Sequence, residues 1–187
     1  MGTVDIVTKE YMRENAIFAD AFNYLIYGGK KVIDPAGLTE IDTATSAVGK
    51  KDALQKYRDV LKAAVIKQDE KMSYVLLGVE NQTDVHYAMP VRNAIYDALQ
   101  YGKQVSDIAA GHRRSQKDYS GKTGGEYLSG FLKEDHIKPV ITLVIHFGAE
   151  EWDGPLSLHE MMPIRDMEIL SYVENYLSLI HISEPTR

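Results

Sequence analysis

The stretch YVLLGVENQ, residues 74–82, decides the fold of this 187-residue chain. Its apolar first part predicts a buried strand, and that strand ends on Glu80, Asn81 and Gln82. Because side chains alternate between the two faces of a strand, Glu80 and Gln82 project from the same face. The strand therefore presents a carboxylate and a long amide together at its end.

The segment before this strand predicts its partner. YRDVLKAAVI is apolar and partly β-branched, KQDEK has the polar character of a turn, and MSYVLLGVENQ is apolar again, a pattern typical of a β-hairpin. With the turn centred near Asp69, we expect Asp59 and Glu80 to lie nearly opposite each other, within one residue. Directly opposed side chains share a face, with Cβ atoms roughly 5 Å apart.

Two carboxylates this close repel each other unless a cation lies between them. Hard oxygen ligands favour Mg²⁺ or Mn²⁺, so Asp59 and Glu80 together predict a metal site. The alternative is that Asp59 begins one strand, Glu80 ends the other, and water solvates both carboxylates. The first interpretation gives the acids a chemical role, and the second gives them none.

The remaining segments predict two helices and a further strand. Residues 8–27 carry the apolar stripe of a helix with Thr8 as its N-cap, and residues 85–111 show helical periodicity. IKPVITLVIHFG, residues 137–148, is a β-branched run typical of a buried strand, in which we expect His146 to be a core histidine. The order helix, hairpin, helix, strand predicts an α/β fold with a mixed sheet.

Composition narrows the class of protein. The chain has no cysteine, which excludes disulfides and thiolate metal sites. No stretch approaches the roughly 18 apolar residues of a membrane span, and the first residues lack the pattern of a signal peptide, so we expect a cytoplasmic protein. The net charge of −6 argues against a general nucleic-acid coat. A nuclease with a local basic channel stays compatible with that charge.

A basic cluster lies in the glycine-rich segment RRSQKDYSGKTGGEYLSG, which we predict to be a loop. Its members are His112, which directly precedes this segment, and Arg113, Arg114 and Lys117 within it. They would suit contacts with a DNA backbone, and the alternative is a solvated loop.

Several of these segments, read together, resemble one family. KYRDVLKAAV supplies an Asp that opens the second strand, Asp59, and SYVLLGVENQ supplies an acid and an amide that end the third, Glu80 and Gln82. Met89 to Arg92 followed by Tyr96 is similar to the opening of the family's next helix. The later strand ends in the matching aromatic-Gly and Trp pattern, at Phe147, Gly148 and Trp152.

On these motifs the chain resembles the recombination-promoting nuclease or putative transposase family of the PD-(D/E)xK nuclease superfamily. The resemblance covers about residues 8–165 and is strongest between residues 57 and 152. It implies a restriction-endonuclease-like core, a mixed sheet flanked by helices in the order α-β-β-β-α-β.

The resemblance implies a metal-dependent DNA endonuclease that promotes recombination or DNA mobility. Asp59, Glu80 and the backbone carbonyl of Asn81 would hold Mg²⁺ or Mn²⁺. Gln82 stands where the superfamily's common form has Lys, so it would position water by a hydrogen bond and carries no charge. The alternative is an inactive relative that binds DNA or protein.

Further residues are implied with alternatives. An acid on the first helix often assists in this superfamily, and Asp20 and Glu14 are the candidates. Arg92 would contact a phosphate or pair with a carboxylate. DNA is the expected partner, no membrane is involved, and a homodimer would supply one active site for each strand.

We divide the chain into three parts. Residues 8–165 form the nuclease-like domain, and residues 166–177 begin a truncated C-terminal region. The last ten residues, SLIHISEPTR (178–187), resemble the read-through translation of a sequencing adaptor. We therefore expect the natural sequence to be cut near Tyr176 and residues 178–187 to be non-native.

Overall fold

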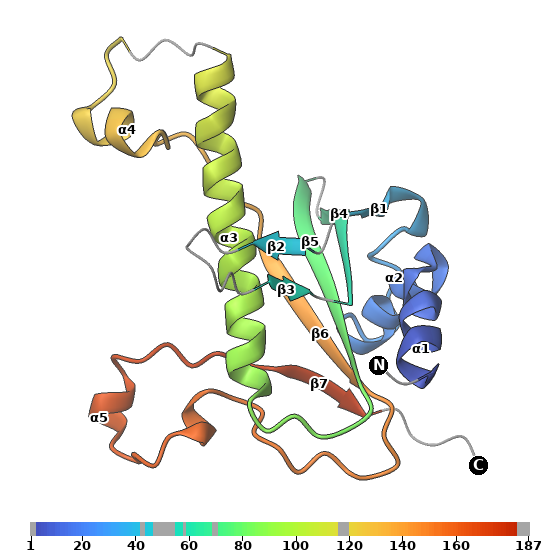
Figure 1. Ribbon diagram of the computed structural model, residues 1–187. Helices are drawn as coiled ribbons and strands as arrows, with labels where there is room; N and C mark the ends of the chain where they lie inside the picture. Colours follow the sequence, from blue (N-terminus) through green and yellow to red (C-terminus); the bar gives the residue numbers. More distant parts are fainter. Residues whose placement is uncertain are drawn as a thin grey trace.

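The protein is an α/β structure with an open, mixed, five-stranded sheet in the order β1-β4-β5-β6-β7. The computed structural model describes residues 3–41, 44–46, 55–57, 59–68, 71–115 and 120–182. Figure 1 shows helices α1 and α2 on one side of the sheet and the long helix α3 on the other. This confirms the predicted α/β class with a mixed sheet.

The helices are α1 (Thr3–Arg13), α2 (Asn15–Leu25), α3 (Met89–Arg114), α4 (Gly124–Ser129) and α5 (Met167–Leu170), with 3₁₀ turns at Pro35–Gly37 and His159–Met161. The strands are β1 (Thr39–Glu40), β2 (Ala44–Ser46), β3 (Gln55–Tyr57), β4 (Val60–Gln68), β5 (Lys71–Gln82), β6 (Val140–His146) and β7 (Leu179–Ile182). β2 and β3 form a separate two-stranded sheet.

Strands β4 and β5 form the predicted hairpin. They are antiparallel, and the register runs from Val60 opposite Val79 to Gln68 opposite Lys71. The turn is shorter than the predicted KQDEK, and its central residues 69–70 lie outside the described ranges. Asp59 directly precedes Val60 and Glu80 directly follows Val79, so the predicted near-opposition of the two acids is confirmed.

Strand β6 confirms the strand predicted from the β-branched run. It lies parallel to β5, with Glu80 beside Val144 and Gln82 beside His146. Parallel neighbours need a crossover, and α3, which the periodicity of residues 85–111 predicts, begins that crossover. Because α3 starts just after β5, the two elements meet at the end of β5 that carries Glu80.

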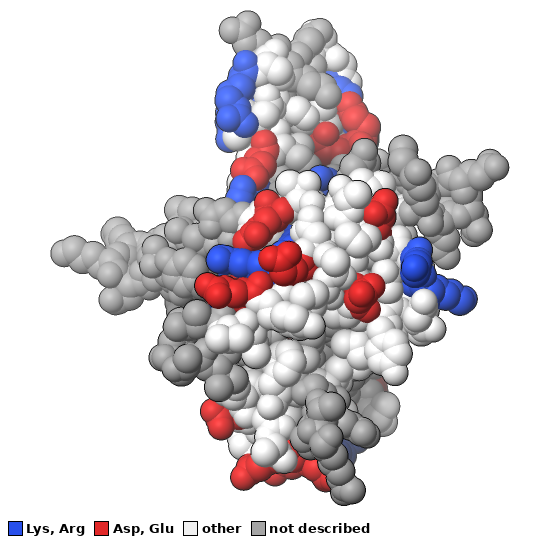
Figure 2. Space-filling view, turned by 90° about the vertical axis from the view of Figure 1, so that its right-hand side faces the viewer, with Lys and Arg blue, Asp and Glu red and all other residues white. Residues whose placement is uncertain are grey.

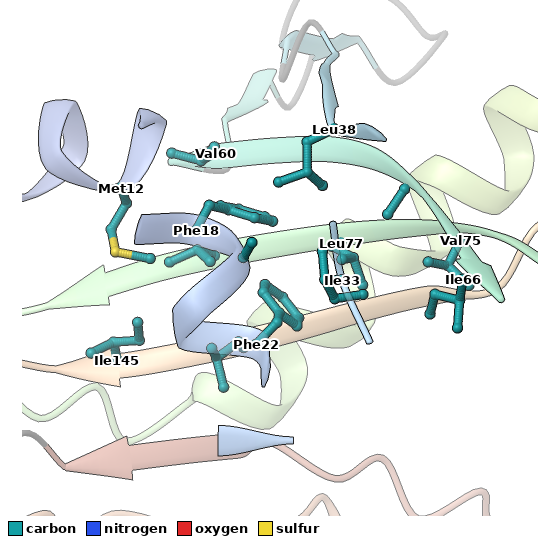
Figure 3. Packing of buried hydrophobic residues seen from close by; sticks show 14 residues of the cluster. Met12, Phe18, Phe22, Ile33, Leu38, Val60, Ile66, Val75, Leu77 and Ile145 are labelled. Carbon is teal, nitrogen blue, oxygen red and sulfur yellow. The ribbon is translucent and has the colours of Figure 1, made fainter. Parts of the chain in front are cut away.

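The core lies between the sheet and α2. Phe18 and Phe22 of α2 are fully buried, with ring centroids 5.0 Å apart. Figure 3 shows their side chains directed toward the strands, near Leu77 of β5 and Ile33. Burial of each such side chain contributes about 1.5–3 kcal/mol, so this layer holds the hairpin rigid.

The predicted single helix over residues 8–27 is wrong, because the chain breaks at Glu14. Glu14 adopts an extended conformation (φ −62°, ψ 121°), and Thr8 lies inside α1 instead of capping it. The residues on either side of this break provide hydrogen-bond acceptors for Lys62 of β4, which is fully buried. Its ammonium donates to the Arg13 carbonyl and to Asn15 Oδ1 (2.6 Å), acceptors that a buried charge needs.

The predicted glycine-rich loop is wrong in part, because residues 124–129 form α4. The helix has a capping box: the Glu126 backbone N–H donates to the Thr123 hydroxyl (3.3 Å), and the Thr123 backbone N–H donates to Glu126 Oε2 (2.8 Å). We call residues 109–115 and 120–135 the arm. Figure 1 shows α4 beside the upper end of α3, beyond the sheet.

The chain after β6 is mostly irregular. Residues 166–177 contain the single turn α5, and β7 lies parallel to β6 inside the ten-residue tail. Strands β1, β4, β5 and β6 of the sheet therefore come from residues before the tail. Within the described ranges, no helix combines the length and the apolar character needed to cross a membrane.

Candidate functional site

The predicted site residues meet at one end of β5. Glu80, Asn81 and Gln82 end this strand, Asp59 precedes its partner β4, and Arg92 lies in the first turn of α3. Figure 1 shows this end of β5 joined by a short loop to the lower end of α3. The fold therefore brings together a hairpin end and a helix start.

Asp59 is tied across the hairpin. Its Oδ2 atom accepts a hydrogen bond from the Asn81 backbone N–H at 2.8 Å. Its Oδ1 atom lies 4.0 Å from Nζ of Lys9 on α1, and the side chain is 22% exposed. One oxygen of Asp59 is thus committed to the backbone, and the other faces a cation at the border with solvent.

Glu80 is fully buried and forms an ion pair. Arg92 Nη2 lies 3.2 Å from Glu80 Oε2, and the Arg92 side chain is 32% exposed. Arg92 Nε also donates to the Tyr96 hydroxyl at 2.9 Å, and the guanidinium lies 5.6 Å from the centre of that ring. Of the two alternatives for Arg92, the structure places it on a carboxylate.

The charges of this group shift its pKa values. Burial acts to lower the pKa of Arg92, but the Glu80 carboxylate and the Tyr96 hydrogen bond outweigh it and raise that pKa. Burial, and next the charge of Glu80, raise the pKa of the Tyr96 hydroxyl. Arg92 is therefore a permanent cation, and Tyr96 is a neutral hydrogen-bond partner at physiological pH.

The side-chain amide of Gln82 contacts the backbone carbonyl of Asn81. Gln82 Nε2 donates to the Asn81 carbonyl at 2.9 Å. This is the carbonyl that the resemblance assigns to a metal ion, and a carbonyl oxygen has two lone pairs. Among the described residues, the buried amide atoms of the Asn81 side chain have no hydrogen-bond partner.

His146 lies beside Gln82 in the register of β5 and β6. It is buried, its Nε2 lies 2.8 Å from the Glu150 carbonyl, and its ring meets Trp152 edge-on with centroids 5.4 Å apart. The prediction of a core histidine is confirmed. Its closeness to the site follows from the parallel pairing of β5 and β6, for which the sequence alone carries no signal.

The first helical segment places a cation near Asp59. Lys9 on α1 is the residue that reaches this carboxylate. Asp20, predicted to assist, lies on the exposed side of α2, and Glu14 is exposed at the break between α1 and α2. The role of either acid stays a prediction.

The donor set fits a hard divalent cation in its chemistry. Asp59 and Glu80 supply carboxylate oxygens and Asn81 a carbonyl oxygen at one end of the hairpin, the ligand type of Mg²⁺ and Mn²⁺. The described residues contain no group of three or more His, Asp or Glu side chains that could hold a metal. Arg92 and Lys9 already balance the two acids, so charge alone does not require a metal ion.

The predicted basic cluster lies at the opposite end of α3. His112, Arg113 and Arg114 form the last turn of this 26-residue helix, and Lys117 lies outside the described ranges. At about 1.5 Å per residue, Arg113 is roughly 30 Å along the helix from Arg92. On the face in Figure 2, the described Lys and Arg side chains are interspersed with Asp and Glu and form no continuous basic surface.

Comparison of the chain with protein-family models, with curated proteins and with solved structures finds no match.

Proposed function

We propose that this chain is a Mg²⁺- or Mn²⁺-dependent DNA endonuclease of the transposase-like kind that promotes recombination or DNA mobility. The observation that carries the proposal is the position of Asp59 and Glu80 next to each other across the β4–β5 hairpin. The family pattern requires an acid at each of these two strand ends, and the hairpin register supplies that arrangement.

The order of the elements supports the same proposal. In the main sheet, the helices α1 and α2 are followed by the strands β1, β4 and β5, then by α3 and β6, which agrees with the order α-β-β-β-α-β that the resemblance implies. Ligands of open α/β sheets commonly bind at the carboxyl ends of strands, and Glu80 and Gln82 lie at such an end.

In this proposal the chain's residues have separate roles. Asp59, Glu80 and the Asn81 carbonyl would hold the ion, which when bound would lower the pKa of a water molecule and stabilise charge on the phosphate. The Gln82 amide would orient water by a hydrogen bond, because it has no charge and takes up no proton.

A second candidate function is DNA or protein binding without catalysis. The observation that favours it is the balance of charge at the site, where Arg92 compensates Glu80 and Lys9 lies near Asp59. A relative that had lost its metal ion would need such internal cations, since an unpaired buried carboxylate is costly.

Plasmid nicking separates the two candidates. We expect nicking with Mg²⁺, none with EDTA, and loss of nicking in Glu80→Gln. Asp107→Asn is the matched control, because Asp107 is an exposed acid farther along α3. Equal nicking by wild type and Glu80→Gln would contradict the nuclease.

If neither wild type nor Glu80→Gln nicks DNA, but both retard it equally in a gel, the function is DNA binding without catalysis. Such binding should weaken steeply with salt, because phosphate contacts release counterions.

A further inference from the structure

We propose that Arg92 is a built-in competitor of the divalent cation: its guanidinium occupies Glu80 in the metal-free protein and leaves it when the cation binds. The inference rests on the proposed function, because it concerns the regulation of that same site.

The first step is the burial of Glu80. Its side chain has no exposed surface, so its charge needs a partner inside the protein whenever a metal ion is absent. Arg92, at 3.2 Å, is a cation that supplies this partnership. The Arg92 guanidinium and a divalent cation would therefore neutralise the same carboxylate, that of Glu80.

The second step is that Arg92 is the partner able to move. A third of its side chain reaches solvent, whereas Glu80 is enclosed. Arg92 Nε is also bonded to Tyr96, four residues along the same helix, which gives the side chain a second anchor. The exchange therefore needs a change in one side chain at the border of the site.

The third step is that α3 itself is fixed. Thr142 of β6 donates its hydroxyl to Asp97 Oδ1 at 2.7 Å, and both residues are buried. This contact lies five residues beyond Arg92, about one and a half turns along the helix, and holds the helix against the sheet. Release of Glu80 is accordingly a movement of the Arg92 side chain and not of the helix.

In the proposed reaction, the guanidinium of Arg92 would contact the phosphate of the substrate once it has left Glu80. A charged, planar group beside the metal-binding acids can pair with two oxygens of a phosphodiester. The two alternatives for Arg92, carboxylate partner and phosphate contact, are then two states of one residue. Cation binding and phosphate binding would be coupled through it.

The test compares Mn²⁺ affinity, by electron paramagnetic resonance of free Mn²⁺ and by calorimetry, in three variants. Arg92→Gln should bind Mn²⁺ at least about tenfold more tightly than wild type, because the competing state is removed. Tyr96→Phe removes one anchor of Arg92 and should shift affinity in the same direction by less. Lys103→Gln removes an exposed cation of α3 and should change nothing.

Thermal unfolding adds a readout that does not depend on activity. Without divalent cations, Arg92→Gln should melt below wild type, and Mn²⁺ should raise its midpoint more than it raises that of wild type. If Arg92→Gln fails to fold, Tyr96→Phe alone decides, because it keeps the charge and most of the volume at the site.

The outcomes separate the inference from the proposed function. If wild type binds Mn²⁺ through Glu80, and neither Arg92→Gln nor Tyr96→Phe binds it more tightly, the inference is overturned and the nuclease proposal stands. If wild type, Arg92→Gln and Tyr96→Phe all fail to bind Mn²⁺, both are overturned.

Discussion

Each end of α3 is held by a polar contact with another segment, and the two contacts differ in how deeply they are buried. At its start, Arg92 pairs with Glu80 of β5, the middle strand of the sheet. At its end, the ring nitrogens of His112 face the Gly130 carbonyl at 3.1 Å and Asp135 Oδ1 at 3.3 Å. The first contact joins the helix to the strand that precedes it, and the second joins it to residues 130–135. Only the first is made against a fully buried carboxylate.

A polar contact costs more free energy to break at the start of α3 than in the arm. The arm combines the last residues of α3 with the six-residue helix α4 and loop residues, and it carries exposed side chains such as Tyr127 and Leu128. The His112 and Asp135 side chains keep 12% and 13% of their surface exposed, so water reaches this contact more readily than it reaches Glu80. At the start of α3 water has no access to Glu80, so loss of a partner leaves a buried charge.

The largest expected effect is at the start of α3. In the absence of divalent cations, Arg92→Gln should lower the free energy of unfolding by about 3–5 kcal/mol, because Glu80 stays buried without its partner. Urea denaturation measures this. The double variant Arg92→Gln, Glu80→Gln should recover most of the lost free energy of unfolding. If Arg92→Gln alone costs less than about 1 kcal/mol, the start of α3 is no more sensitive than a surface ion pair and the expected difference between the two ends is contradicted.

Two glycines test the packing of the two ends. A Cβ at Gly148, near the site, would lie 2.4 Å from the Thr83 carbonyl oxygen, and Gly148→Ala should cost about 3 kcal/mol by overpacking. Gly130, in the arm, has φ +68° and would place a Cβ 3.0 Å from that of Ala109. Gly130→Ala should cost about 1–2 kcal/mol from the left-handed backbone. If thermal unfolding shows that Gly130→Ala destabilises the protein more than Gly148→Ala, the expected difference between the two ends is contradicted.

Acid should loosen the arm. Hydrogen bonds from the Thr123 backbone, the Lys133 backbone and the Thr123 hydroxyl lower the pKa of Glu126 from 4.5 to about 2. A depressed carboxyl pKa gives stability that is complete above pH 4.5 and is lost as the pH falls toward 2.

Amide hydrogen exchange measures this effect. Exchange at Tyr127 to Gly130 should accelerate between pH 4.5 and 2 beyond the intrinsic rate, and Glu126→Gln should remove the pH dependence. Trp152 is the only tryptophan and reports on the other end. Simultaneous loss of Trp152 packing would show that the arm and the site unfold together.

The smallest effect is expected between the two ends. Lys103 and Asp107 form an exposed pair one turn apart on α3. Lys103→Gln should change the free energy of unfolding by at most about 0.5 kcal/mol, because water screens both charges. A larger change in the free energy of unfolding would mean that the Lys103–Asp107 pair affects the contacts at one or both ends of α3.

The sequence predicts the elements that carry strong local patterns. The hairpin, α3 and β6 follow from apolar runs, a helical period and β-branched residues, and these signals agree with the final packing. The opposition of Asp59 and Glu80 was accessible because a hairpin's turn fixes its register. The capping box at Thr123 and Glu126 was also present as a signal for α4.

The sequence does not predict what depends on distant partners. The helix breaks at Glu14 because Lys62 of another element needs the Arg13 carbonyl and Asn15. Likewise, Arg92 meets Glu80 only once α3 packs against the sheet, where Asp97 contacts Thr142 of β6. No periodicity within a segment encodes either contact.

The hairpin also has a consequence for the order of folding. Asp59 and Glu80 meet through a short local closure, whereas β5 and β6 pair Leu76 with Val140 across a long crossover. Loop closure costs more entropy for the longer connection, so contacts of low sequence separation form at a smaller entropic cost. Arg92 lies only twelve residues after Glu80, so the two acids and Arg92 can all be brought together early in folding, before β6 joins the sheet. The acids and the cation that neutralises Glu80 then belong to one local folding unit.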